Sequence, residues 1–418
     1  MLINKILEKF NKPSVTKMDN LNGEDILFKV KNGLGKLTMK FAKDINNDVK
    51  ATFYLGDTPL IMCNSEYCPT CSTMIALAEG RDEADDEVVE ILSELNNIES
   101  LEDSFSKISP ILSLLEDGYY VLKEIEFFPT DGEGNFFWNL KMKAKNYMAS
   151  SYYYAHNYGT IIIEPKFLLP SQGTNSYNKD RVEYYRRKIR NGEKLFGLAI
   201  EMRGTLGLLI DGHHKATACY LEGKPIRCIT IINTFSYKNF NSKEEGISYT
   251  GNNIKYSDIK DGDSIKEFYE KKSKNRKSNI SYKEVYLKEK YIKSIDIGIP
   301  KEEFPDYDTY ALSTLASDTS EEKIRDLLNY IGEDPLEELE EVFCNLRVND
   351  KKRARELCFS ILLLECFQNL WDECVMFLSQ YNDEEVQELF VNLLVEYGFE
   401  YGHNKIKHII DEYFKRPI

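Results

Sequence analysis

The stretch LLIDGHHKATAC, residues 208–219, joins an apolar run to a helical pattern through an Asp-Gly pair. The apolar run predicts a buried strand and the residues from His214 onward predict a helix, so Gly212 falls where the strand gives way to the helix. Backbone amides at a helix start have no partner within the helix, and they attract anions. Gly212 lets the backbone approach a ligand closely, and His213, His214 and Lys215 supply further hydrogen-bond donors. The stretch therefore predicts a phosphate-binding turn.

Two more side chains extend this prediction. Thr217 lies on the first helical turn and can offer its hydroxyl group to the same phosphate. Asp211 can hold Mg²⁺ against phosphates, because hard carboxylate oxygens bind that cation. The simpler alternative is an N-capping Asp211 followed by surface histidines. Zinc at this turn is a weaker alternative, since adjacent histidines alternate in direction and a lysine does not bind the metal.

The turn lies within an alternation of strand and helix patterns. We expect strands at 159–165, 195–202, 205–211 and 225–233, helices at 181–192 and 214–223, and a proline-bounded loop at 168–180. Together these elements predict a compact α+β domain over residues 151–236, which is within the usual size of a domain.

The helical stretch RVEYYRRKIRNG, the two strands after it and the DGHHK turn resemble the ParB/sulfiredoxin superfamily over residues 160–233. In that superfamily a strand–loop–helix of the form G-x-x-R follows such a helix, and ParB proteins place a Gly-Glu-Arg-Arg loop on the phosphates of CTP. Sulfiredoxins have their reactive cysteine at the position of His213, so the resemblance does not extend to sulfinic-acid repair. The turn is most similar to the Asp-Gly-His-His-Arg loop of the free-serine-kinase-like branch, with Lys215 in place of the arginine.

The resemblance implies that the chain binds ATP or another nucleoside phosphate, together with Mg²⁺. The residues implied to hold this ligand are Gly212, His213, His214, Lys215 and Thr217. In the kinase-like branch an upstream glutamate takes the proton from the accepting hydroxyl, but the corresponding loop here carries Ser171 and Gln172. Because an amide does not accept a proton at neutral pH, we consider Asp211, Glu164 and Asp180 as alternative bases.

The predicted function of the turn takes two forms, and thiol redox chemistry or zinc binding at the cysteine cluster described below is a separate third alternative. As an enzyme, the chain would be a phosphotransferase or a nucleotide hydrolase, with Asp211 and Glu164 as catalytic candidates and Lys215 stabilising charge on the phosphates. As a non-catalytic module, the chain would use nucleotide occupancy to switch its contact with a partner. Neither form names an acceptor substrate.

Residues 1–150 predict a separate α+β domain. Short apolar and polar alternation within 24–56 predicts antiparallel strands, and helical patterns follow between 72 and 115. Two apolar runs, 119–128 and 136–144, are separated by a glycine-rich turn and predict a hairpin.

Cys63, Cys68 and Cys71 form a C-x4-C-x2-C cluster between a strand pattern and a helix pattern. Zinc binding with an outside ligand such as His156 is one interpretation, and a low-pKa thiol at the helix start, as in thioredoxin-like proteins, is another. A plant-type iron–sulfur site lacks its fourth cysteine. Ordinary unliganded thiols are the simplest interpretation, and zinc is the metal we expect if the cluster binds one.

Residues 237–317 are rich in lysine and predict a connector, and residues 318–418 predict an all-α domain of helical hairpins, with helical patterns from 321 to 414. Residues 301–418 hold 12 Lys and Arg against 27 Asp and Glu. The C-terminal helices therefore offer either an acidic surface for a basic protein partner or a solvated face. The stretch KKSKNRK at 271–277 is the patch through which nucleic acid would bind, although the net charge of −15 does not favour such binding.

The composition indicates an ordinary globular protein with no membrane segment. No apolar run in the 418 residues reaches the ~20 residues that span a bilayer. The N-terminal stretch has no long apolar segment of the kind that directs secretion, so we expect a cytoplasmic protein without membrane contact. Nine cysteines, an odd number, argue against a disulfide framework.

Overall fold

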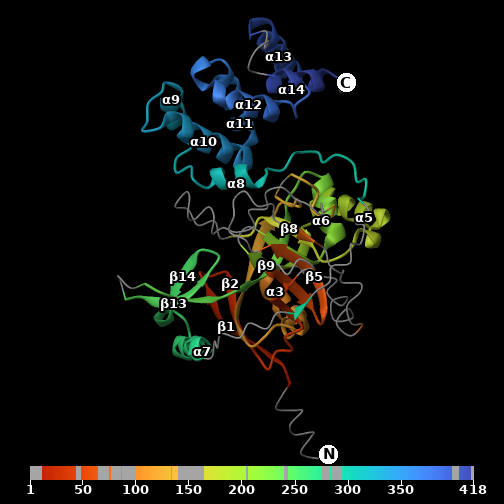
Figure 1. Ribbon diagram of the computed structural model, residues 1–418, viewed down its shortest axis with the longest axis vertical. Helices are drawn as coiled ribbons and strands as arrows, with labels where there is room; N and C mark the ends of the chain where they lie inside the picture. Colours follow the sequence, from red (N-terminus) through yellow and green to blue (C-terminus); the bar gives the residue numbers. More distant parts are fainter. Residues whose placement is uncertain are drawn as a thin grey trace, which may run out of the picture. The chain divides into compact units, whose positions relative to one another are not determined.

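The computed structural model describes residues 12–43, 49–64, 75–76, 86, 100–132, 134–139, 164–203, 206–239, 243–274, 283–284, 294–397 and 404–415. The chain divides into two compact units, Met1–Phe304 and Pro305–Ile418. The first is built on β-sheets with helices and the second is helical (Figure 1), so the expected α+β class with helices at the C-terminal end is confirmed. No helix in the described ranges is long and apolar enough to cross a membrane.

The central element of the first unit is a seven-stranded sheet ordered β1-β2-β7-β11-β9-β10-β8. Its strands are β1 (Ser14–Leu21), β2 (Asp25–Lys31), β7 (Gly118–Phe127), β8 (Phe167–Pro170), β9 (Phe196–Arg203), β10 (Leu206–Asp211) and β11 (Ile226–Asn233). β7 precedes residue 150, yet it pairs antiparallel with β11, which follows that residue. The boundary expected at residue 150 therefore does not separate two folds, because the buried backbone of β7 needs a partner strand on each edge.

The same sheet closes on itself at β8. The Phe128 amide donates to the Lys166 carbonyl at 2.7 Å, and the Leu168 amide donates to the Thr130 carbonyl at 2.9 Å. β8 also runs parallel to β10, so β7, β11, β9, β10 and β8 form a closed ring of strands. The sequence predicted 168–180 wholly as a loop, but its first residues are buried strand residues that complete the ring.

Two helices, α5 (Lys179–Arg190) and α6 (His213–Leu221), pack together beside this ring. Val182 of α5 and Ala216 of α6 enter the same core as Cys228 of β11. The helical period of the sequence places such apolar residues on one face of each helix, so both helices were predictable. α6 follows β10 directly, and its first turn lies at the carboxyl end of that strand.

Glu222 is the C-cap residue that follows α6. Its side chain is 3% exposed and its carboxylate forms three ion pairs. Arg186 and Arg190 of α5 reach the same oxygen at 2.8 and 2.7 Å, and Lys301 reaches the other oxygen at 2.5 Å. Burial by itself raises the pKa of Glu222, but the hydrogen bonds from Arg190, Lys301 and Arg186 lower it to about 2. Glu222 thus ties the end of α6 to α5 and to the segment that ends the first unit.

Residues 235–274, which were expected from 237 onward as part of a connector, form a folded layer of the first unit. β12 (Phe235–Lys238), β13 (Glu245–Tyr249) and β14 (Asn252–Lys255) make an antiparallel sheet, and α7 (Gly262–Lys274) follows it. Ile247, Tyr249 and Ile265 from these elements are buried in the core that also contains β7 residues. Apolar residues are few in this stretch, but those named here enter that core, so the lysine-rich composition was a poor guide to its structure.

A further sheet of the first unit, ordered β15-β3-β4-β5-β6, contains strands that the sequence predicted within 24–56. Its strands are β3 (Leu37–Lys43), β4 (Val49–Leu55), β5 (Thr58–Asn64), β6 (Ile75–Ala76) and β15 (Lys283–Glu284). Helix α3 (Leu101–Leu112) contacts β2 and β7 of the larger sheet. The N-terminal strands therefore belong to two sheets, which period-two alternation does not distinguish.

The hairpin expected from 119–128 and 136–144 forms in part. β7 is present, but Phe136 makes an isolated bridge to Thr130, and residues 137–139 form a turn. Trp138 in that turn is fully buried. Buried aromatic residues are also typical of strands, so the composition of this run predicted a strand where the chain forms a turn. Residues 140–144 lie outside the described part of the chain.

The second unit contains helices α8 (Tyr307–Ser313), α9 (Glu321–Leu328), α10 (Pro335–Asn349), α11 (Lys351–Leu362), α12 (Trp371–Leu378), α13 (Glu384–Tyr397) and α14 (Asn404–Phe414). α9 to α14 agree with the helical patterns expected from 321 onward, and α8 precedes them, so this unit begins before residue 318. One apolar core joins α9 to α14, with Trp371, Phe343 and Phe390 fully buried. Helices α9 to α14 were predictable because their buried residues recur at the helical period, whereas α8 lies in the stretch that was expected as a connector.

We expect Glu222→Gln to lower the free energy of unfolding by about 2 kcal/mol at pH 7, since three cations lose a buried counter-charge. The pKa of Glu222 is lowered in the folded state, so its contribution is present above pH 4.5 and is lost as the pH falls to about 2. Urea unfolding at pH 7 and pH 3 measures this change. Glu193→Gln is the matched control, because Glu193 pairs with Lys188 at the surface and should contribute below about 0.5 kcal/mol. Equal losses in the two variants would contradict this assignment.

Candidate functional site

The DGHHK turn lies between β10 and α6, as the sequence predicted. Gly212 is the N-cap residue of α6 and has a φ of 103°. A Cβ at this position would lie 3.0 Å from the Cα of Gly197, so both the backbone angle and the available space favour glycine. As a glycine, this residue has no side chain that could bond to the first-turn amides of α6.

His213 points into the protein and is 1% exposed. Its Nε2 accepts a hydrogen bond from the backbone amide of Ser171 at 3.1 Å. The centroid of the ring lies 5.2 Å from that of Trp138 and 6.1 Å from that of Phe137. A ring nitrogen that accepts a hydrogen bond carries no proton, so His213 is an acceptor here and not the cationic donor that the sequence predicted.

His214 binds the other end of the same loop. Its Nε2 accepts a hydrogen bond from the backbone amide of Asn178 at 3.0 Å, and its ring meets Trp138 edge to face at 5.3 Å. Burial and then the charge of Arg181 lower the pKa of His214 from 6.5 to about 4. The imidazole is therefore neutral at pH 7.

These contacts fasten residues 171–178 to the start of α6. We call the two bonds, from the amides of Ser171 and Asn178 to the imidazoles of His213 and His214, the histidine latch. Trp138 adds a third bond to the same loop, from its Nε1 to the Gln172 carbonyl at 2.9 Å. Because the imidazole acceptors are neutral and buried, the latch holds while both rings stay unprotonated.

Lys215 and Thr217 are also turned inward. Lys215 is 8% exposed, and its Nζ donates to the Phe196 carbonyl at 2.9 Å. The Thr217 hydroxyl donates to the His213 carbonyl, one helical turn earlier, at 2.8 Å. A polar group that is buried needs a hydrogen-bond partner, and the protein itself supplies one to each of these side chains. The side chains predicted to meet a phosphate therefore have protein partners instead.

The latch brings two helix starts together. Asn178 is the N-cap residue of α5, and its Oδ1 accepts from the Arg181 amide at 2.9 Å, while its own amide donates to His214 of α6. The positive ends of two helix dipoles therefore meet at the latch. Arg181 is exposed and its charge acts on His214, which adds a full positive charge beside both helix starts. This combination attracts an anion.

Of the two predicted catalytic carboxylates, Asp211 lies at the turn and Glu164 does not. Glu164 precedes β8, which runs parallel to β10, so it lies at the opposite end of these strands from Asp211. Its carboxylate pairs with Lys123 at 2.8 Å and with Lys166 at 3.1 Å. Burial raises the pKa of Glu164, but these two lysines outweigh that effect and lower it. Glu164 is therefore an ion-pair residue and cannot act at the turn.

The predicted metal ligands Cys68 and Cys71 lie outside the described residues, as does His156, and Cys63 belongs to β5. Within the described ranges, no group of three His, Cys, Asp or Glu side chains is arranged to hold a metal ion. Zinc binding or thiol chemistry by this cluster therefore stays a prediction. Cys219, by contrast, is buried, and burial raises the pKa of its thiol to about 12, which makes it unreactive.

Glu201 is a titratable residue that the sequence analysis did not single out. It lies on β9 opposite Gly207, and burial raises the pKa of its carboxyl group to about 7, against a hydrogen bond from the backbone of Asn233. Leu198, three residues earlier on β9, is opposite Asp211, so Glu201 lies roughly 10 Å along the strand from the turn. The sequence signal for Glu201 was an acidic residue within an otherwise apolar strand pattern.

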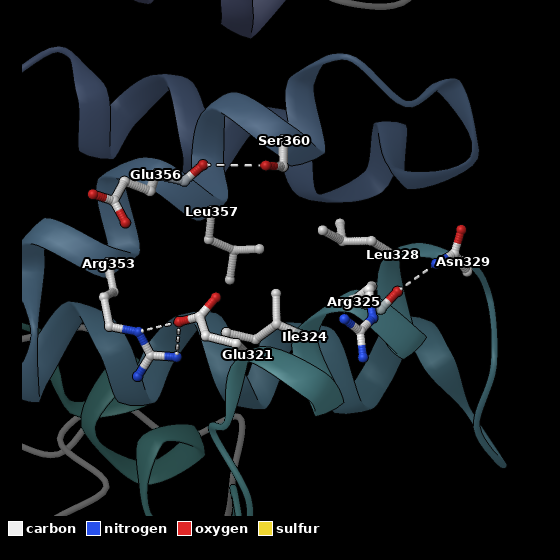
Figure 2. Close-up of a pocket in the computed structure, with 9 residues that line it drawn as sticks. All are labelled: Glu321, Ile324, Arg325, Leu328, Asn329, Arg353, Glu356, Leu357 and Ser360. Atoms are coloured by element: carbon white, nitrogen blue, oxygen red, sulfur yellow. Dashed lines mark hydrogen bonds and ion pairs between the residues drawn. The ribbon is translucent and has the colours of Figure 1, made fainter.

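A pocket of 370 Å³ in the second unit lies between α9 and α11. Figure 2 shows the side chains of Ile324 and Leu357 pointing toward each other across it. Glu321 and Arg353 form an ion pair at one end, and Arg325 lies at the other. Because arginine and glutamate side chains both line this pocket, it does not select the basic partner predicted for the acidic helices.

Comparisons with protein-family models, with characterised proteins and with solved structures found no match to this chain. Strand β9, strand β10, helix α6 and strand β11 follow one another in the order that the sequence predicted. The function therefore has to be inferred from this local order and from the geometry of the turn.

We expect His214→Asn to flatten the pH dependence of stability between pH 7 and pH 5. The pKa of His214 is lowered in the folded state, so unfolding takes up a proton below pH 6.5, and the wild type should lose about 2 kcal/mol more than the variant. Glu201 acts in the opposite sense because its pKa is raised, so the measurement is the difference between the two proteins in urea unfolding. His408→Asn, on an exposed position of α14, should behave as the wild type. If the free energy of unfolding fell equally in the wild type and in His214→Asn between pH 7 and pH 5, His214 would not be a buried neutral acceptor.

We expect Lys215→Met to reduce the free energy of unfolding, because the substitution removes a hydrogen bond to the buried carbonyl group of Phe196. The Phe196 carbonyl loses its donor, at a cost of about 1–3 kcal/mol, while methionine retains most of the apolar stem. Thermal unfolding followed by circular dichroism measures the change. Lys224→Met, at an exposed position just after α6, is the matched control and should have little effect. Unchanged stability of Lys215→Met would contradict the inward position of this lysine.

Proposed function

We propose that the chain binds the phosphate groups of a nucleoside phosphate, ATP or another, at the start of α6. The observation that carries this proposal is the meeting of two helix starts at the histidine latch, with the charge of Arg181 beside them. Backbone amides at a helix start and the dipoles of both helices favour a bound anion. The DGHHK turn and the order of elements around it, which resemble the ParB/sulfiredoxin superfamily, support the same class of ligand.

The roles of the residues differ from those that the resemblance implies. The first-turn amides of α6 and the guanidinium of Arg181 would contact phosphate, and Gly212 would allow the close approach. His213, His214 and Lys215 would act by holding the loop and the helix start in the binding geometry before the ligand arrives. A site that is ordered in advance loses less entropy on binding, which is the advantage of this arrangement.

Asp211 is the carboxylate that would hold Mg²⁺ at this site. It is half-buried at the turn, its charge acts on His214, and carboxylate oxygens are the ligands that this cation prefers. When bound, Mg²⁺ neutralises charge on the phosphates. Asp211 is also the candidate base for a phosphotransferase or a nucleotide hydrolase. Release of ADP or inorganic phosphate from bound ATP would decide for an enzyme, and binding without turnover would decide for a nucleotide-gated switch.

Saturating ATP or CTP with Mg²⁺ should raise the melting temperature by roughly 5 °C. Arg181→Ala should weaken the affinity about tenfold, because one charge-assisted hydrogen bond is lost. Arg187→Ala is the matched control, since Arg187 is an exposed arginine further along the same helix. Scanning fluorimetry and titration calorimetry measure the two effects.

Two results would reject the site. One is the absence of any shift in melting temperature with ATP, ADP and CTP. The other is an equal loss of affinity in Arg181→Ala and Arg187→Ala, which would indicate general attraction to positive charge and not binding at the helix starts.

A further inference from the structure

The small sheet β12-β13-β14 has one face that the core does not use. The strand register places Phe235 in one row with Ser248 and Asn253, and Tyr237 in the next row with Lys255. Residues two apart on a strand point to the same side, so the two aromatic rings and Lys255 share this face. Phe235 is 61% exposed and Tyr237 is half-buried.

The opposite face of this sheet is packed. Ile247 is fully buried there, the Tyr256 hydroxyl donates to Ser236 at 3.0 Å, and Ile265 of α7 enters the same core. Figure 1 shows α7 next to β13 and β14. The fold therefore needs one face of the sheet, and the exposed phenyl ring on the other face adds little to stability.

The chemistry of the open face is aromatic and polar. Ser248 and Asn253 offer hydrogen-bonding groups beside the rings, and Lys255, whose side chain is 47% exposed, lies in the same row as Tyr237. Unpaired nucleic-acid bases stack on aromatic side chains, while their edges and phosphates bind polar and cationic groups. Binding of an apolar protein partner would require a contiguous apolar patch larger than two aromatic rings.

Positive charge on this face comes from Lys255, whose side chain is 47% exposed. Lys238 points to the packed face, where Glu245 lies near both Lys238 and Lys266 of α7. Lys255 lies near Glu244. Such an exposed ion pair contributes little in water, so a phosphate can compete with the glutamate.

We propose that this face binds single-stranded nucleic acid, with unpaired bases stacked on Phe235 and Tyr237 and a phosphate contacted by Lys255. The surface is distinct from the phosphate site at α6 and does not depend on it. The basic stretch 271–277, which the sequence predicted as the nucleic-acid contact, would then contribute long-range attraction and not the stacking itself.

Fluorescence anisotropy of the full chain with labelled oligo-dT and oligo-rU of about 15 nucleotides tests this proposal. Phe235→Ala and Tyr237→Ala should each weaken binding about tenfold. Phe414→Ala, a comparably exposed ring on α14 at 46%, is the matched control and should leave binding unchanged. Lys255→Ala should reduce the salt dependence of binding, whereas Lys238→Ala, on the opposite face of the sheet, and Lys407→Ala, at an exposed position of α14, should not.

Binding of either oligonucleotide with this pattern supports the proposal, and the tighter of the two identifies RNA or DNA as the ligand. The proposal is overturned if the wild type binds neither oligonucleotide or binds duplex DNA as tightly, because stacking requires unpaired bases. It is also overturned if Phe235→Ala and Tyr237→Ala bind as the wild type does while replacement of Lys271, Lys272 and Lys274 by alanine abolishes binding. Arg181→Ala should retain oligonucleotide binding, which separates this test from that of the phosphate site.

Discussion

Two hydrogen bonds, in which buried neutral imidazoles accept backbone amides, hold the site of the first unit together. His213 and His214 receive the amides of Ser171 and Asn178, so the loop after β8 and the start of α5 cannot move independently of α6. A proton on either ring would turn the acceptor into a donor and set two N–H groups against each other. The pKa of His214 is lowered mainly by burial, so the packing around Trp138 is what keeps this bond intact at neutral pH.

The DGHHK motif suggests that the same side chains both order the site and attract an anion. In the structure these two tasks fall to different groups. The paired histidines organise the site, and the attraction of an anion falls to two helix starts and to Arg181. The far end of α6 is held by the opposite means, since the charged carboxylate of Glu222 gathers three cations there. The amides of two helix starts and the charge of Arg181 make this end of α6 electropositive, which suits a phosphate ligand.

The closed ring of strands gives the first unit its continuity. β7 supplies partners to β2 and β11 along its length, and the residues after it pair with β8, so a segment before residue 150 closes a fold whose other strands follow it. The small sheet after β11 packs one face on this body and leaves the other to solvent. The proposed phosphate site and the proposed aromatic face therefore lie in one compact unit without sharing residues.

The sequence by itself determined where most helices and strands lie, because apolar periodicity follows from local backbone geometry; α5, α6, β9 to β11 and α9 to α14 are of this kind. It also located the turn, where Gly212 adopts a φ of 103°, a backbone angle that favours glycine. Only the tertiary structure decided what the turn does. Whether an imidazole donates or accepts depends on the group that faces it, and for His213 that group is 42 residues away in the chain. The strand pairing across residue 150 and the raised pKa of Glu201 have the same origin, since long-range pairing and burial are properties of the packed chain and not of any local stretch.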